Sequence, residues 1–139
     1  MAPGSIRSYS GRMSTTSERV HDESPGPGEQ IAAAVGSWPG VEIGPHRFGG
    51  VEFRFGRREL GHLHGDRMAD LPFPRRVRDE LIAAGRARPH HVLPDTGWVT
   101  IPIGGPGEAD HAIELFRLSY DRARRARRAP VPDTGASSA

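Results

Sequence analysis

Hydrophobic and polar residues alternate in the middle of the chain, and this alternation predicts an antiparallel β-sheet. Across 51–55 the apolar residues Val51, Phe53 and Phe55 share one face of an extended strand, and the residues between them are charged. Further on, Gly65-Asp66 is a dipeptide typical of tight hairpins between two strands. The predicted strands are 41–46, 51–55, 57–64, 67–71 and 98–103.

Apolar residues at a spacing of three and four predict three helices around these strands. Pro39-Gly40 and Gly85 end the first two helices. The predicted helices are 29–38, 74–85 and 108–124. This order predicts an α+β fold, a two-layer sandwich in which helices cover one face of a four- to five-stranded antiparallel sheet and leave the other face open.

The chain of 139 residues is long enough for one domain with one hydrophobic core. Residues 28–124 carry the periodic pattern, so we expect the domain there. Residues 1–27 and 125–139 are rich in Ser, Gly, Pro or Arg, which predicts a disordered leader and a disordered basic, Pro-containing tail. The leader also has the Ser- and Arg-rich composition of a transit peptide, or it precedes a later start at Met13.

Composition limits the chemistry that the chain can perform. It has no Cys, which excludes disulfides, thiolate nucleophiles and zinc–cysteine sites, so any metal must have oxygen or nitrogen ligands. All 19 basic residues are Arg, which excludes lysine Schiff-base chemistry and a P-loop lysine. No apolar run approaches the roughly 18 residues of a membrane span, and we expect a cytoplasmic protein without membrane contacts.

Histidines are the strongest candidates for a functional site. His62 and His64 are two residues apart on a predicted strand, so both side chains point to one face, and Glu59 points to the other unless a bulge intervenes. A second pair, His90 and His91, lies in a Pro-bounded loop. A His-x-His strand with a loop histidine is one way to build a three-nitrogen metal site with an open position. The alternative is a set of surface histidines in a chain with seven of them.

The last strand adds an aromatic residue to this candidate site. Its apolar residues alternate such that Trp98 lies on the opposite face to the core. Trp98, His62, His64 and Arg54, together with Glu52, are therefore predicted to share the open surface of the sheet. An aromatic ring beside imidazoles and an Arg suits a planar, partly anionic ligand. The alternative is a solvated face with one exposed Trp.

At these residues the chain resembles the small bacterial members of the fungal luciferase domain family. The matching elements are Arg58-Glu59, His62-x-His64, Leu71-Pro72, His91 before Pro94, Trp98 and Ser119-Tyr120. The resemblance implies oxidation of a polyphenol-like pyrone by molecular oxygen, as in the fungal members. It also implies a site formed by His62, His64, His91 and Trp98 with support from Glu59.

The order of elements also resembles the YjbR-type fold, which is found in proteins proposed to bind DNA. This second resemblance is topological and covers three short segments, Trp38-Pro39-Gly40, Trp98-Val99-Thr100 and Ser119-Tyr120. A shared fold does not establish a shared function.

Three functions are compatible with the sequence. In the first, His62, His64 and His91 are catalytic, Trp98, Arg54 and Glu59 bind a small aromatic or enolic molecule, and the cofactor is either absent or a divalent metal held by the three histidines. In the second, Arg75, Arg76, Arg78 and the C-terminal Arg run bind nucleic acid. In the third, the domain is a non-catalytic interaction module. A net charge of only +2 and one predicted surface Trp favour the small-molecule ligand over nucleic acid.

Overall fold

The computed structural model describes residues 24–47 and 49–128, so the predicted leader and tail lie mostly outside the described residues. The elements in chain order are α1 (Pro27–Gly36), β2 (Val41–Pro45), β3 (Val51–Phe55), β4 (Arg58–His64), β5 (Met68–Pro72), α2 (Arg75–Ala83), β6 (Arg88–Pro89), β7 (Trp98–Pro102) and α3 (Glu108–Arg128). Each predicted helix and strand is present, and the predicted ends agree with the observed ones to within a few residues. Within the described residues, no helix combines the length and the apolar character needed to cross a bilayer.

The strands form one antiparallel sheet in the order β2-β3-β4-β5-β7-β6. This confirms the predicted α+β class, although the described sheet has six strands where four to five were predicted. The additional strand is β6, a two-residue segment that pairs with β7 at the edge of the sheet. Such a short strand has no alternation that a sequence pattern could reveal.

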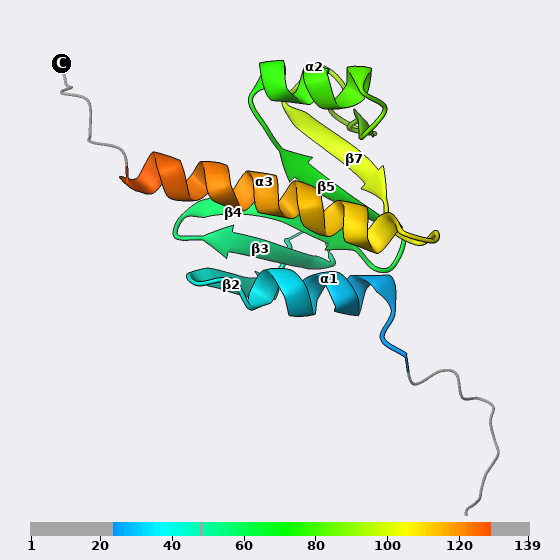
Figure 1. The fold of residues 1–139 in the computed structure, drawn as a ribbon, viewed down its shortest axis with the longest axis vertical. Helices are drawn as coiled ribbons and strands as arrows, with labels where there is room; N and C mark the ends of the chain where they lie inside the picture. Colours follow the sequence, from blue (N-terminus) through cyan, green and yellow to red (C-terminus); the bar gives the residue numbers. More distant parts are fainter. Residues whose placement is uncertain (1–23, 48, 129–139) are drawn as a thin grey trace, which may run out of the picture.

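Helices α1 and α3 lie side by side across one face of the sheet (Figure 1). Their apolar residues form one core with the strands, and α2 adds Val77 and Leu81 to the same core. Phe53 of β3 and Phe116 of α3 meet edge to face, with ring centroids 5.1 Å apart at the centre of this layer. Phe53 is fully buried beneath α3.

A β-bulge in β4 decides which side chains reach the other face of the sheet. Phe53 pairs with Gly61 and the next residue of β3, Arg54, pairs with Glu59, so Leu60 is an extra residue in β4. Because of this extra residue, Glu59 and His62 are three positions apart and yet lie on the same face. Gly61 is required here, since a Cβ at this position would lie 2.7 Å from the Phe116 ring.

Candidate functional site

Strands β4, β5 and β7 place a row of polar side chains on the face that the helices leave uncovered. His62 of β4 pairs with Asp70 of β5, and Asp70 pairs with Thr100 of β7, so these residues are direct neighbours across the sheet. The loop that follows β6 brings His90 and His91 onto the same face.

Four imidazoles converge on one oxygen of Asp70. Its Oδ2 atom lies 2.8 Å from Nε2 of His64, 3.2 Å from Nε2 of His90, and 3.3 Å from Nε2 of both His62 and His91. The other carboxylate oxygen, Oδ1, accepts a hydrogen bond of 2.6 Å from the Thr100 hydroxyl. Asp70 is therefore the centre of the histidine cluster, which we define as His62, His64, Asp70, His90 and His91.

Most of this cluster is buried, which corrects the expectation of an open, exposed face. His62 is 6% exposed, His90 8% and Asp70 not at all. The rings of His46 and Trp98 cover His62, with centroids 3.9 and 5.4 Å away. His46 comes from the loop after β2 and Trp98 from β7, so these two side chains, and not a helix, cover His62 on this face of the sheet.

The cluster carries fixed charges. Burial lowers the pKa of His62, but its hydrogen bonds with Asp70 and Glu59 outweigh burial and raise that pKa to about 9. Burial raises the pKa of Asp70, and hydrogen bonds from His62, Thr100 and His64 reverse this effect and hold it well below the ordinary value. His62 is therefore an imidazolium between two carboxylates, and these three groups together carry one net negative charge.

The hydrogen bonds of His90 define its tautomer. Its Nδ1 atom accepts backbone N–H groups from Val92 and Leu93, at 3.1 and 3.0 Å. The ring proton therefore sits on Nε2, which donates to Asp70. Burial and the neighbouring His91 lower the pKa of His90, with burial the larger cause, so the ring stays neutral. His90 is a fixed donor to Asp70 and has no lone pair left for a metal ion.

Two sets of ligand atoms in the cluster are close enough to hold a metal ion. One set is His62, His64 and Asp70, and the other is Asp70, His90 and His91. The tautomer of His90 favours the first set. In that set Nδ1 of His62 contacts Oε2 of Glu59 at 2.6 Å, which is the carboxylate–histidine arrangement that orients metal ligands in proteins.

The cluster forms the floor of a pocket of about 380 Å³. Its walls include Trp98 and the apolar side chains of Val92 and Leu93, which are 67% and 47% exposed at the rim. His91 is the most accessible imidazole of the cluster, with 44% of its side chain exposed. A pocket with apolar walls and polar groups at its base is typical of small-molecule sites.

The structure brings together five of the six residues that the sequence indicated. His62, His64, His91, Trp98 and Glu59 all line this pocket. Glu59 reaches it because of the bulge at Leu60. Arg54 does not: it forms an ion pair of 3.0 Å with Glu52 and lines an adjoining hollow beside His46.

Sequence reasoning missed Asp70, and it named His90 without assigning it to the site. The hairpin sequence does not reveal Asp70, because a two-residue turn at Gly65-Asp66 would pair His64 with Arg67 and place Ala69 opposite His62. In the structure the turn has three residues, His64 pairs with Met68, and Asp70 therefore lies opposite His62. The role of His90 has no sequence signal either, because it depends on backbone N–H groups of the loop that follows it.

Comparison with known proteins supports a family assignment. The family model of the Luciferase domain matches residues 57–119, which span the structure from the start of β4 into α3 and include the whole histidine cluster. No curated protein and no solved structure matches the chain. Residues 57–119 therefore carry a luciferase domain. The topological resemblance to the YjbR-type fold stays a prediction.

Proposed function

We propose that the histidine cluster binds a divalent metal ion and that the pocket above it binds a small aromatic or enolic molecule for oxidation by molecular oxygen. The observation that carries this proposal is the convergence of four imidazole Nε2 atoms on one buried carboxylate oxygen. A buried cluster of this kind is costly to fold, and such groups concentrate at functional sites.

The ligand set of the proposed site is His62, His64 and Asp70, with His91 at the pocket mouth. Two histidines and one carboxylate are the donor set of non-haem iron sites that react with oxygen. The net negative charge of His62, Asp70 and Glu59 attracts a cation, and a divalent metal ion would replace the proton on Nε2 of His62. When bound, the metal would supply a place where oxygen and an enolate oxygen can be activated.

The remaining residues hold these ligands in position. Glu59 accepts the Nδ1 proton of His62, so Nε2 is the nitrogen that would release its proton and face the metal position when a metal ion binds. Thr100 and His90 donate to the two oxygens of Asp70 and fix the carboxylate plane. We assign these residues positioning roles, and among the histidines we assign His91 the role of general base, because it is the most accessible to a ligand.

The substrate class follows from the pocket walls. Trp98 offers a ring for stacking, and Val92 and Leu93 supply an apolar rim. A planar enol or phenol fits this combination, with its hydroxyl toward His91. Addition of both atoms of O2 to such a substrate balances without any external reductant, so the chain needs no further redox cofactor for this step.

Elemental analysis and calorimetry with Fe(II), Mn(II) and Zn(II) test the metal site in the full chain purified without a His-tag. We expect one metal per chain, and loss of binding in His64→Ala. The matched control is His111→Ala, because His111 lies outside the cluster, bonded to the Arg86 carbonyl. Equal metal binding by both variants would overturn the metal site.

Oxygen consumption by the metal-loaded protein with a panel of catechols, pyrones and β-diketones tests the oxidation. We expect uptake with at least one enolic compound and none with its O-methylated analogue. Metal binding with no uptake on any member of the panel would overturn the oxidation and leave a metal-binding domain.

A further inference from the structure

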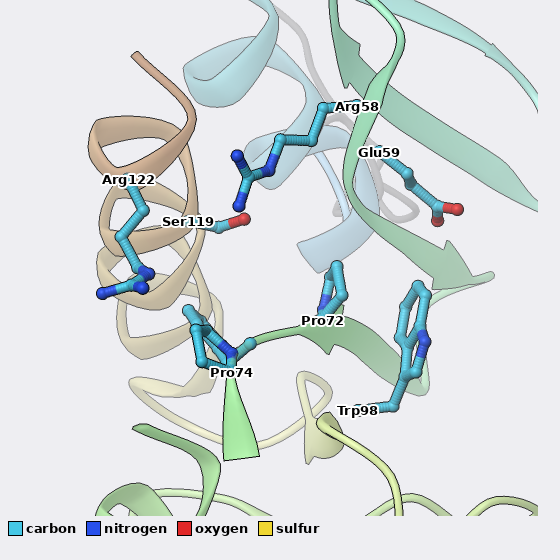
Figure 2. A pocket seen from close by; sticks show the side chains of 8 residues that line it. Arg58, Glu59, Pro72, Pro74, Trp98, Ser119 and Arg122 are labelled. Carbon is cyan, nitrogen blue, oxygen red and sulfur yellow. The ribbon is translucent and has the colours of Figure 1, made fainter. Parts of the chain in front are cut away.

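A second pocket lies beside the histidine pocket, where strands β4 and β5 separate. Their ladder ends at the pair His62 and Asp70, and the strands have no paired residues beyond it toward Arg58 and Pro72. A pocket of about 430 Å³ opens there between the two strands and α3 (Figure 2). Its lining residues are Arg58, Glu59, Pro72, Phe73, Pro74, Trp98, Ser119 and Arg122.

Two guanidinium groups enter this pocket from different elements. Figure 2 shows Arg58 extending from β4 toward α3, and Arg122 extending from α3 into the same space beside Pro74. The carboxylate of Glu59 points to the opposite side in this view, toward Trp98 and away from both arginines. The pocket therefore has a cationic end formed by Arg58 and Arg122.

Neither arginine has an ion-pair partner within the described part of the chain, and Nε of Arg122 is buried there without a hydrogen-bond partner. Several other arginines do pair, for example Arg117 with Asp121 and Arg86 with Glu114. A buried donor without a partner is unfavourable unless a bound group satisfies it. Two guanidinium groups facing one cavity are the arrangement that binds a carboxylate or a phosphate in proteins.

The cationic pocket adjoins the histidine pocket. Glu59 and Trp98 line both of them. Between the arginines and Trp98 the lining is apolar, formed by Pro72, Phe73 and Pro74. A ligand that spans both pockets would have its anionic end at the arginines, its middle along this apolar wall and a ring beside Trp98.

We propose that Arg58 and Arg122 bind the carboxylate or phosphate group of a small molecule whose aromatic or enolic ring lies in the histidine pocket. The anion site stands on the two arginines alone. The placement of the ring rests on the proposed function and narrows its substrate class to anionic, ring-containing molecules.

The anion site is tested by calorimetric titration of the full, metal-free chain with inorganic phosphate and with 3-(4-hydroxyphenyl)propanoate. We expect at least one of them to bind, and Arg58→Gln and Arg122→Gln each to weaken that binding about tenfold or more, because each variant removes a charge-assisted hydrogen bond. Arg125→Gln is the matched control, since Arg125 lies exposed on the same helix and its loss changes the net charge equally. Which of the two probes binds more tightly separates a phosphate ligand from a carboxylate.

Equal affinity of wild type and both pocket variants for each probe, or no measurable binding of either, would overturn the anion site. Melting temperatures show whether Arg122→Gln is folded, and Arg58→Gln, which changes an exposed residue, tests the site independently.

The link between the two pockets is tested with the methyl ester of 3-(4-hydroxyphenyl)propanoate, which we expect to bind about tenfold more weakly than the acid. Trp98→Leu should weaken binding of the acid and leave the affinity for phosphate unchanged. If acid and ester bind equally, the link is wrong. His64→Ala should leave phosphate binding intact, so a failed metal site and a failed anion site give different results.

Discussion

The two faces of the sheet are both buried near β5, but by opposite means. Toward the helices, Leu71 and Ala69 pack in an apolar core under α3. On the other face, Asp70 is equally inaccessible, yet it is surrounded by imidazoles and a hydroxyl. Burial of apolar side chains stabilises the first face directly. On the polar face, burial of charged groups is unfavourable, and only their pairing with one another offsets this cost.

This difference suggests what each face contributes. An apolar layer needs only volume and shape, so it determines the fold and its stability. The charged groups of this face, the His62 imidazolium between the carboxylates of Asp70 and Glu59, are a poor way to gain stability, because hydrophobic residues of the same volume would do as well or better. Their presence is therefore better explained by ligand binding, and the following predictions test this separation of roles.

The largest effect is expected for two neighbouring residues of β5 that point to opposite faces. Leu71→Ala leaves a cavity in the core and should destabilise the chain by about 2–5 kcal/mol without changing the metal affinity of the folded protein. Asp70→Asn removes the charge that pairs with His62 and should cost about 3–5 kcal/mol and also abolish metal binding. Urea denaturation and metal titration measure the two effects separately. If Asp70→Asn still binds metal with unchanged affinity, the separation between the faces is wrong.

Much of the apolar face could be predicted from the sequence, because its signal is local. The alternation in Val51–Phe55 gives that strand with its observed bounds, and it identifies Phe53 as core. Likewise, the even spacing of His62 and His64 places both on one face, since strand side chains alternate whatever the rest of the fold. These inferences depend only on neighbours in the chain.

The polar face could be predicted only in part, because its arrangement depends on register. The extra residue at Leu60 moves Glu59 onto the face of His62, and a strand pattern does not reveal where a bulge lies. Arg54 was expected to bind ligand, but Glu52 on the same strand pairs with it and holds it in the adjoining hollow. Burial of His62 depends on His46 and Trp98, which are distant in sequence.

An intermediate effect is expected from pH. The pKa of His62 is about 9 in the folded chain and near its ordinary 6.5 when unfolded, so its contribution is complete below pH 6.5 and is lost as pH rises through 9. That contribution is on the order of 3 kcal/mol. His46 and His90 have lowered pKa values in the folded chain, mainly because of burial. The unfolded chain therefore binds these protons more readily, and the free energy of unfolding decreases as pH falls below 6.5.

Stability of the metal-free chain should therefore be greatest near pH 6.5 and decline toward both pH 5 and pH 9.5. Urea denaturation across this range, with a chelator present, measures the profile. His62→Gln should remove the alkaline decline and keep the acidic one. An alkaline decline of the same size in this variant would mean that His62 is not the responsible group.

The smallest effect is expected for Glu59→Gln, which tests how the bulge serves the polar face. A glutamine oxygen can still accept the Nδ1 proton of His62, so the ring orientation should persist while one negative charge is lost. The pKa of His62 should fall by roughly one unit, since a nearby carboxylate favours the imidazolium, and the melting temperature should move by only a few degrees. Glu52→Gln is the matched control, because Glu52 lies on the same face opposite His62 but pairs with Arg54. NMR titration measures the pKa of the His62 ring in both variants. An equal fall of this pKa in Glu59→Gln and Glu52→Gln would mean that any negative charge on this face acts on His62. A fall in Glu59→Gln alone shows that His62 pairs with Glu59, the residue that the bulge brings into position.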